Sequence, residues 1–348
     1  MCRRNSLSAE QQAAADQTAE FMRSDRQAFV LHGLAGTGKT ALLAHLAQRC
    51  PDALLCAPTG KAAFTLRQRT GRDASTIHAA FHEFIGRSRR RDREVLDFAP
   101  RFEQGELRGR LVLLDEASMV CQKLAREMLA SGARIIAAGD PGQLAPVEGI
   151  PFFTCPDTLL TQVHRQAWGS GIIRQAHAVL SGQPYQPDGE EFQVADEPPD
   201  ADFGVALCYR NATRRALNAE IRESLGYGGR WPLAGELVVC LRNNSTVGVY
   251  NGAVYETLAD FDPARGRIEL DVEGREVSIP HCRFQGDDRP ADFDFGYALT
   301  VHKAQGSEWD AVLLVDEYPR GDPVGRRRWL YTAITRAASR IVVVRPAA

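Results

Sequence analysis

The sequence lacks the features of a membrane protein, a disulfide-stabilised protein and a zinc protein. No unbroken apolar run approaches the length that spans a bilayer, and residues 1–16 contain no apolar signal-peptide segment. The cysteines form no C-x-x-C pair and do not gather with histidines. They are Cys2, Cys50, Cys56, Cys121, Cys155, Cys208, Cys240 and Cys282. We therefore expect a cytoplasmic protein with neither a zinc site nor a disulfide framework.

The chain also lacks an excess of positive charge. Its 42 Lys and Arg residues stand against 44 Asp and Glu residues, which gives a formal net charge of −2. A global basic footprint for nucleic acid is therefore excluded, and any such binding must come from a local groove. The 44% hydrophobic and 25% charged residues are ordinary for a globular protein, and 348 residues suffice for two or three domains.

One stretch carries a specific chemical signal, because residues 33–40 read GLAGTGKT. It follows an apolar run from Ala28 to Leu31 and opens a helical segment that ends before Pro51, which predicts a strand, a phosphate loop and a helix. The residues expected around the phosphates are Gly33, Ala35, Gly36, Thr37, Gly38, Lys39 and Thr40. Lys39 would reach the β- and γ-phosphates and Thr40 would ligate Mg²⁺, whereas a plain glycine-rich helix cap is the alternative.

Two further strands end in polar residues that suit nucleotide hydrolysis. Residues 111–114 form an apolar run typical of a strand buried on both faces, and it ends in Asp115 and Glu116. Asp115 fits Mg²⁺ coordination and Glu116 fits a general base that orients water, with an exposed strand end as the alternative. The predicted strand 134–138 ends in GDPGQ, so Gln143 reaches the same edge either as a γ-phosphate sensor or as a turn residue.

The segment before the first strand supports two interpretations. Ser8 and Gln11 have the spacing of a capping box at the start of a helix that runs through Met22. The Gln11 amide also offers a donor and an acceptor side by side, as reading an adenine edge requires. Local physical chemistry favours the cap.

An arginine-rich segment lies in a small insertion at residues 81–107. Five of the seven residues from 87 to 93 are arginines, which predicts a solvated loop or, as the alternative, a phosphate contact. Residues 95–102 have extended character and are followed by a turn. The insertion could therefore form a small projecting hairpin.

The second half of the chain, from about residue 160, reads as another α/β unit. It has a predicted helix at 171–180, a connector rich in proline and acid at 184–199, a strand at 202–209 and a helix through Ser224. Residues 231–290 change to short β segments that read as an inserted β-barrel. Strand character returns at 295–301 and 311–315, a helix is expected at 329–337, and 341–344 is a final strand.

The predicted fold is α/β, with parallel sheets whose polar residues gather on one edge. The first domain comprises residues 1–80 and 108–160, and the second comprises 161–230 and 291–348 around the inserted 231–290. The second half has no phosphate loop of its own. Its arginines Arg165 and Arg336 therefore look like partners for a nucleotide bound by the first half.

Taken in order, these motifs resemble those of superfamily 1 DNA helicases of the RecD-like branch, which includes RecD and phage Dda. The resemblance covers nearly the whole chain through GLAGTGKT, APTGKAA, TIH, LLDEASM, GDPGQLAPV, VHRQ, YALTVHKAQGSEWD and YTAITRA. It implies two tandem RecA-like P-loop NTPase domains, with an SH3-like β-barrel inserted in the second. It also implies ATP and Mg²⁺ as cofactors and a DNA-stimulated ATPase that moves 5′ to 3′ on single-stranded DNA.

The resemblance assigns roles to individual residues. Gln11 would read adenine, Gln143 would couple the γ-phosphate to the second domain, and Arg165 and Arg336 would act as arginine fingers. Closure on the nucleotide would involve Gly306 and Glu308. The implied DNA contacts are Pro58, Lys61, Thr76, His78 and Phe81 in the first domain, and Asn211, Thr300, His302 and Lys303 in the second.

Three functions compete at this point. The first is a monomeric ATP-driven helicase that acts on single strands and on single-strand/duplex junctions, alongside replication, recombination or repair proteins. The second is an ATP-switched protein that remodels DNA complexes without robust unwinding, favoured by the short insertion at 81–107. A small-molecule P-loop kinase is the third, but it would not need a second α/β half with two arginines.

Overall fold

The computed structural model describes residues 7–90, 93–100, 105–146, 149–163, 169–199, 203–244, 247–285 and 291–345. The chain divides into two compact units, Met1–Trp168 and Gly169–Ala348, whereas the sequence placed the boundary near residue 160. Each unit is described by itself. Within the described ranges, no helix has both the length and the apolar character needed to cross a bilayer.

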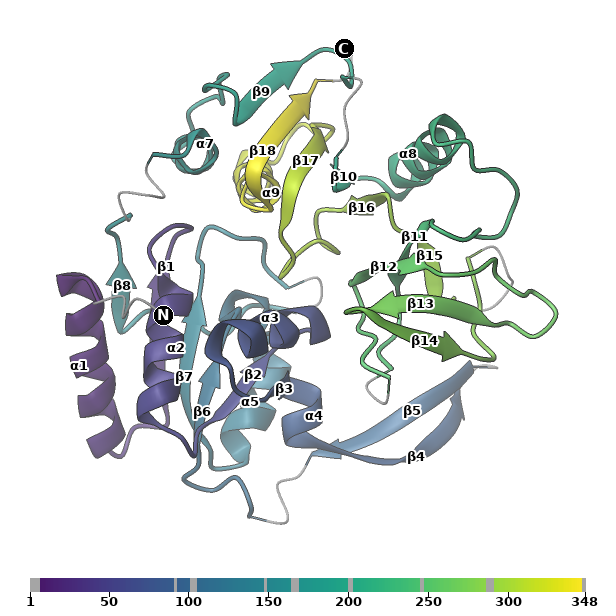
Figure 1. Ribbon diagram of the computed structural model, residues 1–348. Coiled ribbons are helices and arrows are strands. Elements are labelled where there is room, and N and C mark those ends of the chain that lie inside the picture. Colours follow the sequence, from purple (N-terminus) through teal and green to yellow (C-terminus); the bar gives the residue numbers. More distant parts are fainter. Residues whose placement is uncertain are drawn as a thin grey trace. The chain divides into compact units, whose positions relative to one another are not determined.

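Unit 1 is built on a six-stranded sheet in which every neighbouring pair is parallel, in the order β3-β2-β6-β7-β1-β8 (Figure 1). Its strands are β1 (Ala28–Gly33), β2 (Leu54–Ala57), β3 (Ala74–Thr76), β6 (Leu111–Leu114), β7 (Arg134–Gly139) and β8 (Thr158–Leu160). The order sets β1, β7 and β6 side by side. The carboxyl ends of these strands, where the predicted nucleotide residues follow, therefore lie on one edge of the sheet.

Helices cover both faces of this sheet. They are α1 (Ala9–Arg23), α2 (Lys39–Arg49), α3 (Gly60–Thr70), α4 (Ile77–Phe81) and α5 (Gln122–Ala130), with a short 3₁₀ turn at Ala117–Met119. Successive strand residues point to opposite faces, so Leu31 packs in the core with α1 and α2 while Val30 packs in the core with α4 and α5. This double burial explains the unbroken apolar runs of the strands.

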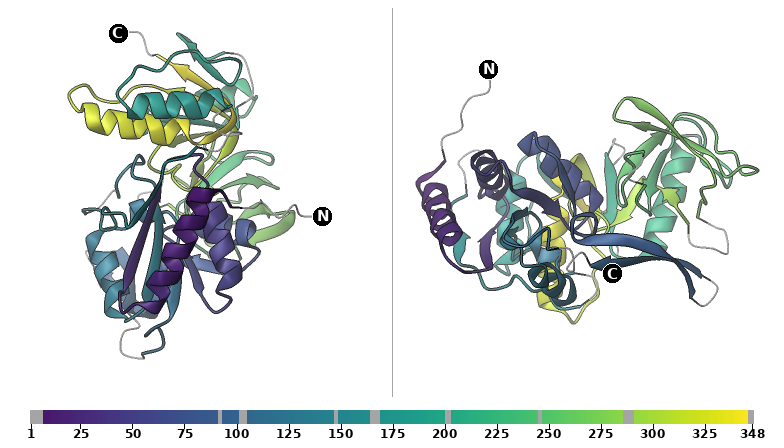
Figure 2. Two further views of the ribbon diagram at one scale, coloured as in Figure 1. Left: turned by 90° about the vertical axis from the view of Figure 1, so that its left-hand side faces the viewer. Right: turned by 90° about the horizontal axis from the view of Figure 1, so that it is seen from below.

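A two-stranded antiparallel hairpin follows α4 and projects away from the parallel sheet of unit 1 (Figures 1 and 2). It consists of β4 (His82–Arg90) and β5 (Arg93–Pro100), with a register shift between Phe84 and Gly86. The predicted hairpin is confirmed. The expectation that the arginine run forms a loop is wrong for residues 87–90, because they pair with residues 93–96 across the hairpin.

Unit 2 has a second all-parallel sheet, in the order β16-β10-β17-β18-β9. Its strands are β9 (Phe192–Ala195), β10 (Val205–Cys208), β16 (Ala298–Thr300), β17 (Trp309–Val315) and β18 (Ala337–Val344). The helices are α7 (Gly171–Leu180), α8 (Asn211–Ser224) and α9 (Pro323–Ile334). Helices α7 and α9 lie side by side (Figure 2, left).

Two sequence expectations for unit 2 are wrong. The segment 184–199 was expected to be a connector, but it contains β9, which pairs with β18. The helix expected at 329–337 begins earlier, at Pro323, because Asp322 caps it through the Gly325 N–H at 2.8 Å. It ends at Ile334, since residues from 337 onward enter β18.

The insertion in unit 2 is an antiparallel five-stranded sheet with its own hydrophobic core. Its strands are β11 (Leu237–Cys240), β12 (Val254–Thr257), β13 (Ile268–Val272), β14 (Arg275–Ile279) and β15 (Phe293–Phe295), in the order β14-β13-β12-β11-β15. The single strand expected at 295–301 is divided between this sheet and the parallel sheet. Gly296 lies at the division, where a Cβ would approach the Val238 carbonyl carbon to 2.9 Å.

Candidate functional site

The phosphate loop of unit 1 connects β1 to α2 through a tight turn. The Thr37 N–H and hydroxyl both donate to the Leu34 carbonyl oxygen, at 3.3 and 2.8 Å. Gly36 and Gly38 have φ angles of 82° and 78°, a region that glycine adopts without strain. A Cβ on Gly33 would lie 2.5 Å from the Thr37 hydroxyl, so the loop requires glycine there. No side chain caps α2, which leaves its first N–H groups available to an anion.

Lys39 lies at this loop among oxygen acceptors. Its Nζ donates to the carbonyl oxygens of Gly33 and Leu34, at 2.7 and 3.1 Å, and lies 3.4 Å from Asp140 Oδ2. Asp140 is 1% exposed and follows β7, and its other oxygen accepts from the Gly142 N–H at 2.9 Å. An ammonium group surrounded in this way can exchange neutral acceptors for phosphate oxygens.

The acidic pair at the end of β6 has the chemistry of a cation site. Burial raises the pKa of Asp115, although the hydrogen bond from the Glu116 N–H at 2.9 Å and the charges of Lys39 and Arg69 oppose the shift. Glu116 has a φ of 52°, which is strained for a residue other than glycine. Because these interactions do not fully offset the burial of Asp115, its carboxylate is suited to a divalent cation.

Thr40 and Asp115 suit a Mg²⁺ ion better than they suit a metal ion whose ligands all come from the protein. No group of three or more His, Cys, Asp or Glu side chains able to hold a metal occurs among the described residues. Magnesium is commonly bound by one or two protein oxygens, with water and nucleotide phosphates as its other ligands. The half-buried Thr40, in the first turn of α2, and Asp115 supply such a small oxygen set.

Two glutamines border the loop. The Gln143 side chain is 7% exposed, its Oε1 has no hydrogen-bond partner, and its backbone N–H donates to the Asp140 carbonyl oxygen at 3.2 Å. The capping box predicted for Ser8 and Gln11 is confirmed. The Gln11 amide nitrogen also donates to the Gly38 carbonyl oxygen at 3.2 Å, so α1 is tied to the phosphate loop. Adenine recognition by Gln11 stays a prediction.

The DNA contacts expected in unit 1 follow the neighbouring strands β2 and β3. Pro58 and Lys61 follow β2, and the Lys61 Nζ lies 5.6 Å from the centre of the Phe64 ring. Thr76 ends β3 and caps α4 by accepting the Ala79 N–H at 3.1 Å. These residues share the carboxyl edge of the sheet with the phosphate loop.

His78 and Phe81 differ sharply in accessibility. His78 is exposed, stacks on His82 at 5.2 Å, and has its pKa lowered chiefly by partial burial, so it is uncharged near neutral pH. Phe81 is 1% exposed and packs in the hydrophobic core with Ile77. The prediction that Phe81 contacts DNA is therefore wrong, because its ring is buried in the hydrophobic core.

The arginine expected to complete the nucleotide site is fixed within unit 2. Arg336 is 7% exposed, and its guanidinium donates to the carbonyl oxygens of Thr332 and Ser307, both at 3.0 Å. Ser307 lies between Gly306 and Glu308, so Arg336 joins the end of α9 to the segment expected to close on the nucleotide. Arg165 lies outside the described residues. Both finger roles stay predictions.

The DNA contacts expected in unit 2 lie around α8 and the loop after β16. Asn211 and Lys303 are exposed, His302 is half-buried, and Thr300 is 7% exposed, which leaves the Thr300 side chain little surface for DNA. Burial lowers the pKa of His302, so the ring is uncharged near neutral pH. Lys303 keeps an exposed surface but is partly buried, and this partial burial lowers its pKa; Arg214 adds to the shift and Asp294 opposes it.

Several residues that shape these sites were not singled out from the sequence. Asp140 follows a buried strand as Asp115 does, and this shared position was a usable signal. Arg214 and Asp294 form a buried ion pair across 80 residues of sequence, for which no local pattern exists. Glu317 accepts the N–H groups of Tyr209 and Arg210 at 3.0 and 2.7 Å, at the start of α8.

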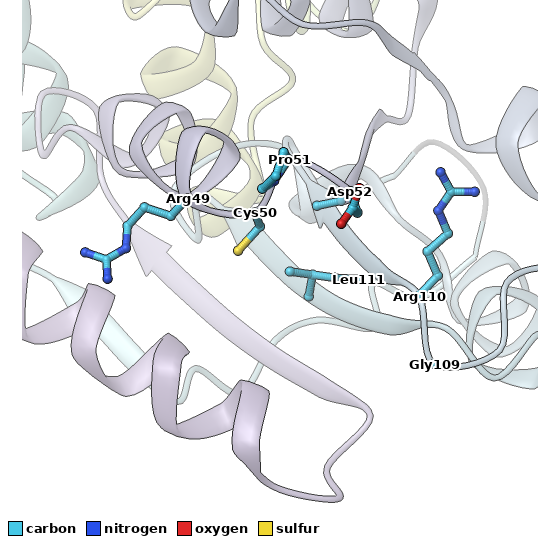
Figure 3. Close-up of a pocket in the computed structure, with 8 residues that line it drawn as sticks. Arg49, Cys50, Pro51, Asp52, Gly109, Arg110 and Leu111 are labelled. Carbon is cyan, nitrogen blue, oxygen red and sulfur yellow. The ribbon is translucent and has the colours of Figure 1, made fainter.

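A pocket of about 480 Å³ lies at the opposite end of α2 from the phosphate loop (Figure 3). It is lined by Arg49, Cys50, Pro51, Asp52, Ala53, Gly109, Arg110 and Leu111. The side chains of Arg49 and Arg110 extend to opposite sides and do not converge on the pocket (Figure 3). Helix α2 separates it from Lys39 by roughly 15 Å, at 1.5 Å per residue. This pocket is not the nucleotide site.

Two family models match the chain in the order of its two parallel sheets. Residues 6–194 match the AAA domain, and residues 295–344 match the UvrD-like helicase C-terminal domain. The first match includes the phosphate loop, the acidic pair and Gln143. The second includes the segment around Gly306 and the arginine at 336.

Two named proteins resemble the chain over more than half of its length. It is 33% identical to the ATP-dependent RecD2 DNA helicase of Deinococcus radiodurans over 97% of this chain and 49% of that protein. It is 30% identical to the ATP-dependent DNA helicase dda of Enterobacteria phage T4 over 60% of this chain and 55% of that one. The chain thus spans about half the length of these relatives.

Solved structures share the fold. The Bacteroides Pif1 helicase in complex with ADP-AlF₃ and single-stranded DNA has a TM-score of 0.65, at 20% identity over 97% of this chain and 92% of that one. Two parallel sheets and an antiparallel insertion are therefore common to both folds. Together with the motifs on the first sheet, these matches show that the chain belongs to the superfamily 1 helicases, in the branch that contains RecD, Dda and Pif1.

Proposed function

We propose that the protein is an ATP-dependent DNA helicase that moves 5′ to 3′ on single-stranded DNA. The observation that carries this proposal is the placement of Lys39, Asp140 and Asp115 after the adjacent strands β1, β7 and β6. That edge can bind and hydrolyse a nucleotide. The side chains proposed to contact DNA follow β2 and β3 on the same edge. The sheet can therefore link the nucleotide state to the affinity for DNA.

In the proposed reaction, the phosphate loop binds the triphosphate and Lys39 neutralises its β- and γ-oxygens. Mg²⁺ held by Thr40 and Asp115 would lower the charge on the same oxygens. Glu116 orients the attacking water and accepts its proton, a role for which its fixed backbone suits it. Gln143 responds to the γ-phosphate, because the NH₂ group of its amide can donate to a phosphate oxygen.

The second unit completes the motor. Arg165 and Arg336 stabilise charge on the transferring phosphoryl group, and Gly306 and Glu308 close on the nucleotide. Hydrolysis releases this closure, so the two units alternate their grip on the strand. Pro58, Lys61, Thr76 and His78 hold DNA in unit 1, whereas Asn211, His302 and Lys303 hold it in unit 2.

The two insertions serve the junction between single strand and duplex. We assign strand separation to the β4–β5 hairpin, because it projects from unit 1 next to the His78 segment (Figure 1). The five-stranded insertion of unit 2 is assigned as an SH3-like barrel. The hairpin favours unwinding over the alternative of an ATP-switched remodelling protein.

The test uses the purified chain on partial duplexes with a 5′ or a 3′ single-stranded tail. ATP-dependent release of the strand from the 5′-tailed substrate alone supports the proposal, and a Lys39→Ala variant should release nothing. DNA-stimulated hydrolysis without release would replace helicase activity with remodelling. ATP hydrolysis that is indifferent to DNA would exclude both functions.

A further inference from the structure

Helix α8 buries a polar stripe where a packed helix usually buries apolar side chains. Arg214, Asn218 and Arg222 recur every four residues and are 3%, 4% and 7% exposed. The Asn218 amide bonds both backbone groups of Ala298, which ties α8 to β16. Such a stripe is costly to bury unless each member is bonded, so its partners indicate its purpose.

Arg214 connects three segments with one guanidinium group. It forms a buried ion pair with Asp294 on β15, and its Nη2 donates to Gln285 Oε1 at 3.3 Å. Its Nε donates to Asn211 Oδ1, also at 3.3 Å. Asn211 is the first residue of α8, one turn before Arg214, and its side chain is otherwise exposed.

The bond from Arg214 decides which end of the Asn211 amide faces outward. A guanidinium group has only donors, so it must contact the carbonyl oxygen of the amide and cannot contact its NH₂ group. The NH₂ group is then left to the exposed side. Asn211 is thereby presented as a hydrogen-bond donor, which is what a phosphate oxygen requires.

A carboxylate lies beside the start of α8. Glu317 accepts the Tyr209 and Arg210 N–H groups just before the helix and the Thr213 hydroxyl in its first turn, so its negative charge repels a phosphate there. We therefore expect side-chain donors, rather than the helix backbone, to hold a DNA phosphate near α8. Exposed donors beside Arg214 include Asn211, which it bonds, and Lys303, whose pKa its charge lowers.

We propose that Arg214 is a positioning residue that fixes Asn211 as a hydrogen-bond donor to the DNA backbone. The inference rests on the proposed function, in which Asn211 contacts single-stranded DNA. Asp294 and Gln285 hold the guanidinium group in place. Arg214 itself remains buried and does not contact DNA.

The same helix supplies a matched control. Arg222 pairs with Glu236 at 2.6 and 3.0 Å and donates to the Gly229 carbonyl oxygen at 2.9 Å. Its guanidinium also lies 3.8 Å from the centre of the Phe295 ring. Arg222 therefore fastens α8 to the same inserted sheet, about three turns away from Asn211. Substituting it disturbs a comparable buried pair without removing the Asn211 contact.

The experiment measures the affinity of Arg214→Lys and Arg222→Lys for single-stranded DNA over a range of salt concentrations. Lysine keeps the charge opposite Asp294 but loses the planar fork that also reaches Asn211. Arg214→Lys should weaken binding about ten-fold, the effect of one hydrogen bond to a charged group, while Arg222→Lys stays within about two-fold. The salt slope should stay unchanged, because a neutral amide releases no counterion.

A double mutant separates positioning from folding. In an Asn211→Ala background, Arg214→Lys should cause no further loss of affinity. Equal losses for Arg214→Lys and Arg222→Lys, a loss that persists in the Asn211→Ala background, or a flatter salt slope would each overturn the proposal. A wild-type chain that fails to bind single-stranded DNA would instead overturn the proposed function, and this inference with it.

A second variant keeps the test valid if Arg214→Lys does not fold. Asn211→Asp can still accept from Arg214, but it turns a carboxylate oxygen toward the phosphate in place of the NH₂ group. It should retain the thermal melting temperature of the wild type and lose at least about ten-fold in DNA affinity. Wild-type affinity in Asn211→Asp would refute the assigned orientation.

Discussion

The two parallel sheets contain comparable strand–turn–helix units with opposite electrostatic character. In unit 1, β1 leads through glycines into α2, and no side chain caps the helix. In unit 2, β10 leads into α8, which also has no side-chain cap, but the Glu317 carboxylate bonds the Tyr209 and Arg210 N–H groups just before it. The first helix start can accept a phosphate, whereas the acid beside the second repels one. The two units therefore have similar folds but different chemistry, because different residues follow their strands.

The same contrast holds for the two buried cation–carboxylate contacts. Lys39 and Asp140 are 3.4 Å apart, and Lys39 also has two carbonyl acceptors, so its contacts can be exchanged for phosphate oxygens. Arg214 and Asp294 are 3% and 5% exposed and form a closed ion pair. The first pair is suited to catalysis, whereas the second is suited to holding a neighbouring side chain in place.

The largest effect is expected from removing the positive charge of Lys39 in unit 1. Lys39→Ala should reduce ATP hydrolysis by at least about 100-fold, because one preorganised charge-stabilising group is lost. Single-stranded DNA affinity without nucleotide should change by less than about two-fold. Steady-state hydrolysis and fluorescence anisotropy measure the two effects. A variant that hydrolyses ATP normally would contradict the assignment of the loop.

A smaller effect should follow from filling the space at Gly33. Gly33→Ala sets a Cβ 2.5 Å from the Thr37 hydroxyl, which must distort the phosphate loop. We expect a KM for ATP raised about ten-fold and a free energy of unfolding lowered by about 1–3 kcal/mol. Gly228→Ala in unit 2 is the control, since no atom lies within 4 Å of its added Cβ. Equal effects of both substitutions would argue against a tight loop.

The pH dependence of DNA binding tests the DNA contact assigned to Lys303 in unit 2. Lysine is charged below its pKa, and the pKa of Lys303 is lowered by burial and by Arg214. Its phosphate contact should therefore weaken as pH rises from 7 toward 10, at a lower pH than an ordinary lysine would show. Lys303→Arg should hold its affinity over this range, because arginine stays charged. Parallel titration curves for the two proteins would contradict this role.

The smallest expected effect concerns Glu317, the acid beside the start of α8. Glu317→Gln removes a negative charge but keeps an acceptor for the Tyr209 and Arg210 N–H groups. The free energy of unfolding should fall by about 1 kcal/mol, because hydrogen bonds to a charged acceptor are weakened. DNA affinity at low salt should rise about two-fold, because one repulsive charge is lost. A fall in affinity would show that Glu317 organises the DNA contact.

Local patterns in the sequence determined the elements of the nucleotide site. The strand at 111–114 and the helix at 171–180 have the predicted bounds, because an apolar run and a periodic apolar face each depend on nearby residues alone. The phosphate loop was likewise readable, since its glycines and lysine are contiguous. Phe81 was misassigned because its motif position said nothing of the core that encloses it.

Only the tertiary structure decided the contacts between residues far apart in the chain. Strand β9 was not predicted from the proline-rich segment that contains it, because its pairing partner β18 lies about 150 residues later. The Lys39–Asp140 contact joins residues 101 positions apart, and the Arg214–Asp294 pair joins residues 80 apart. Burial makes such pairs strong, and burial is a property of the packed sheets rather than of any local stretch of sequence.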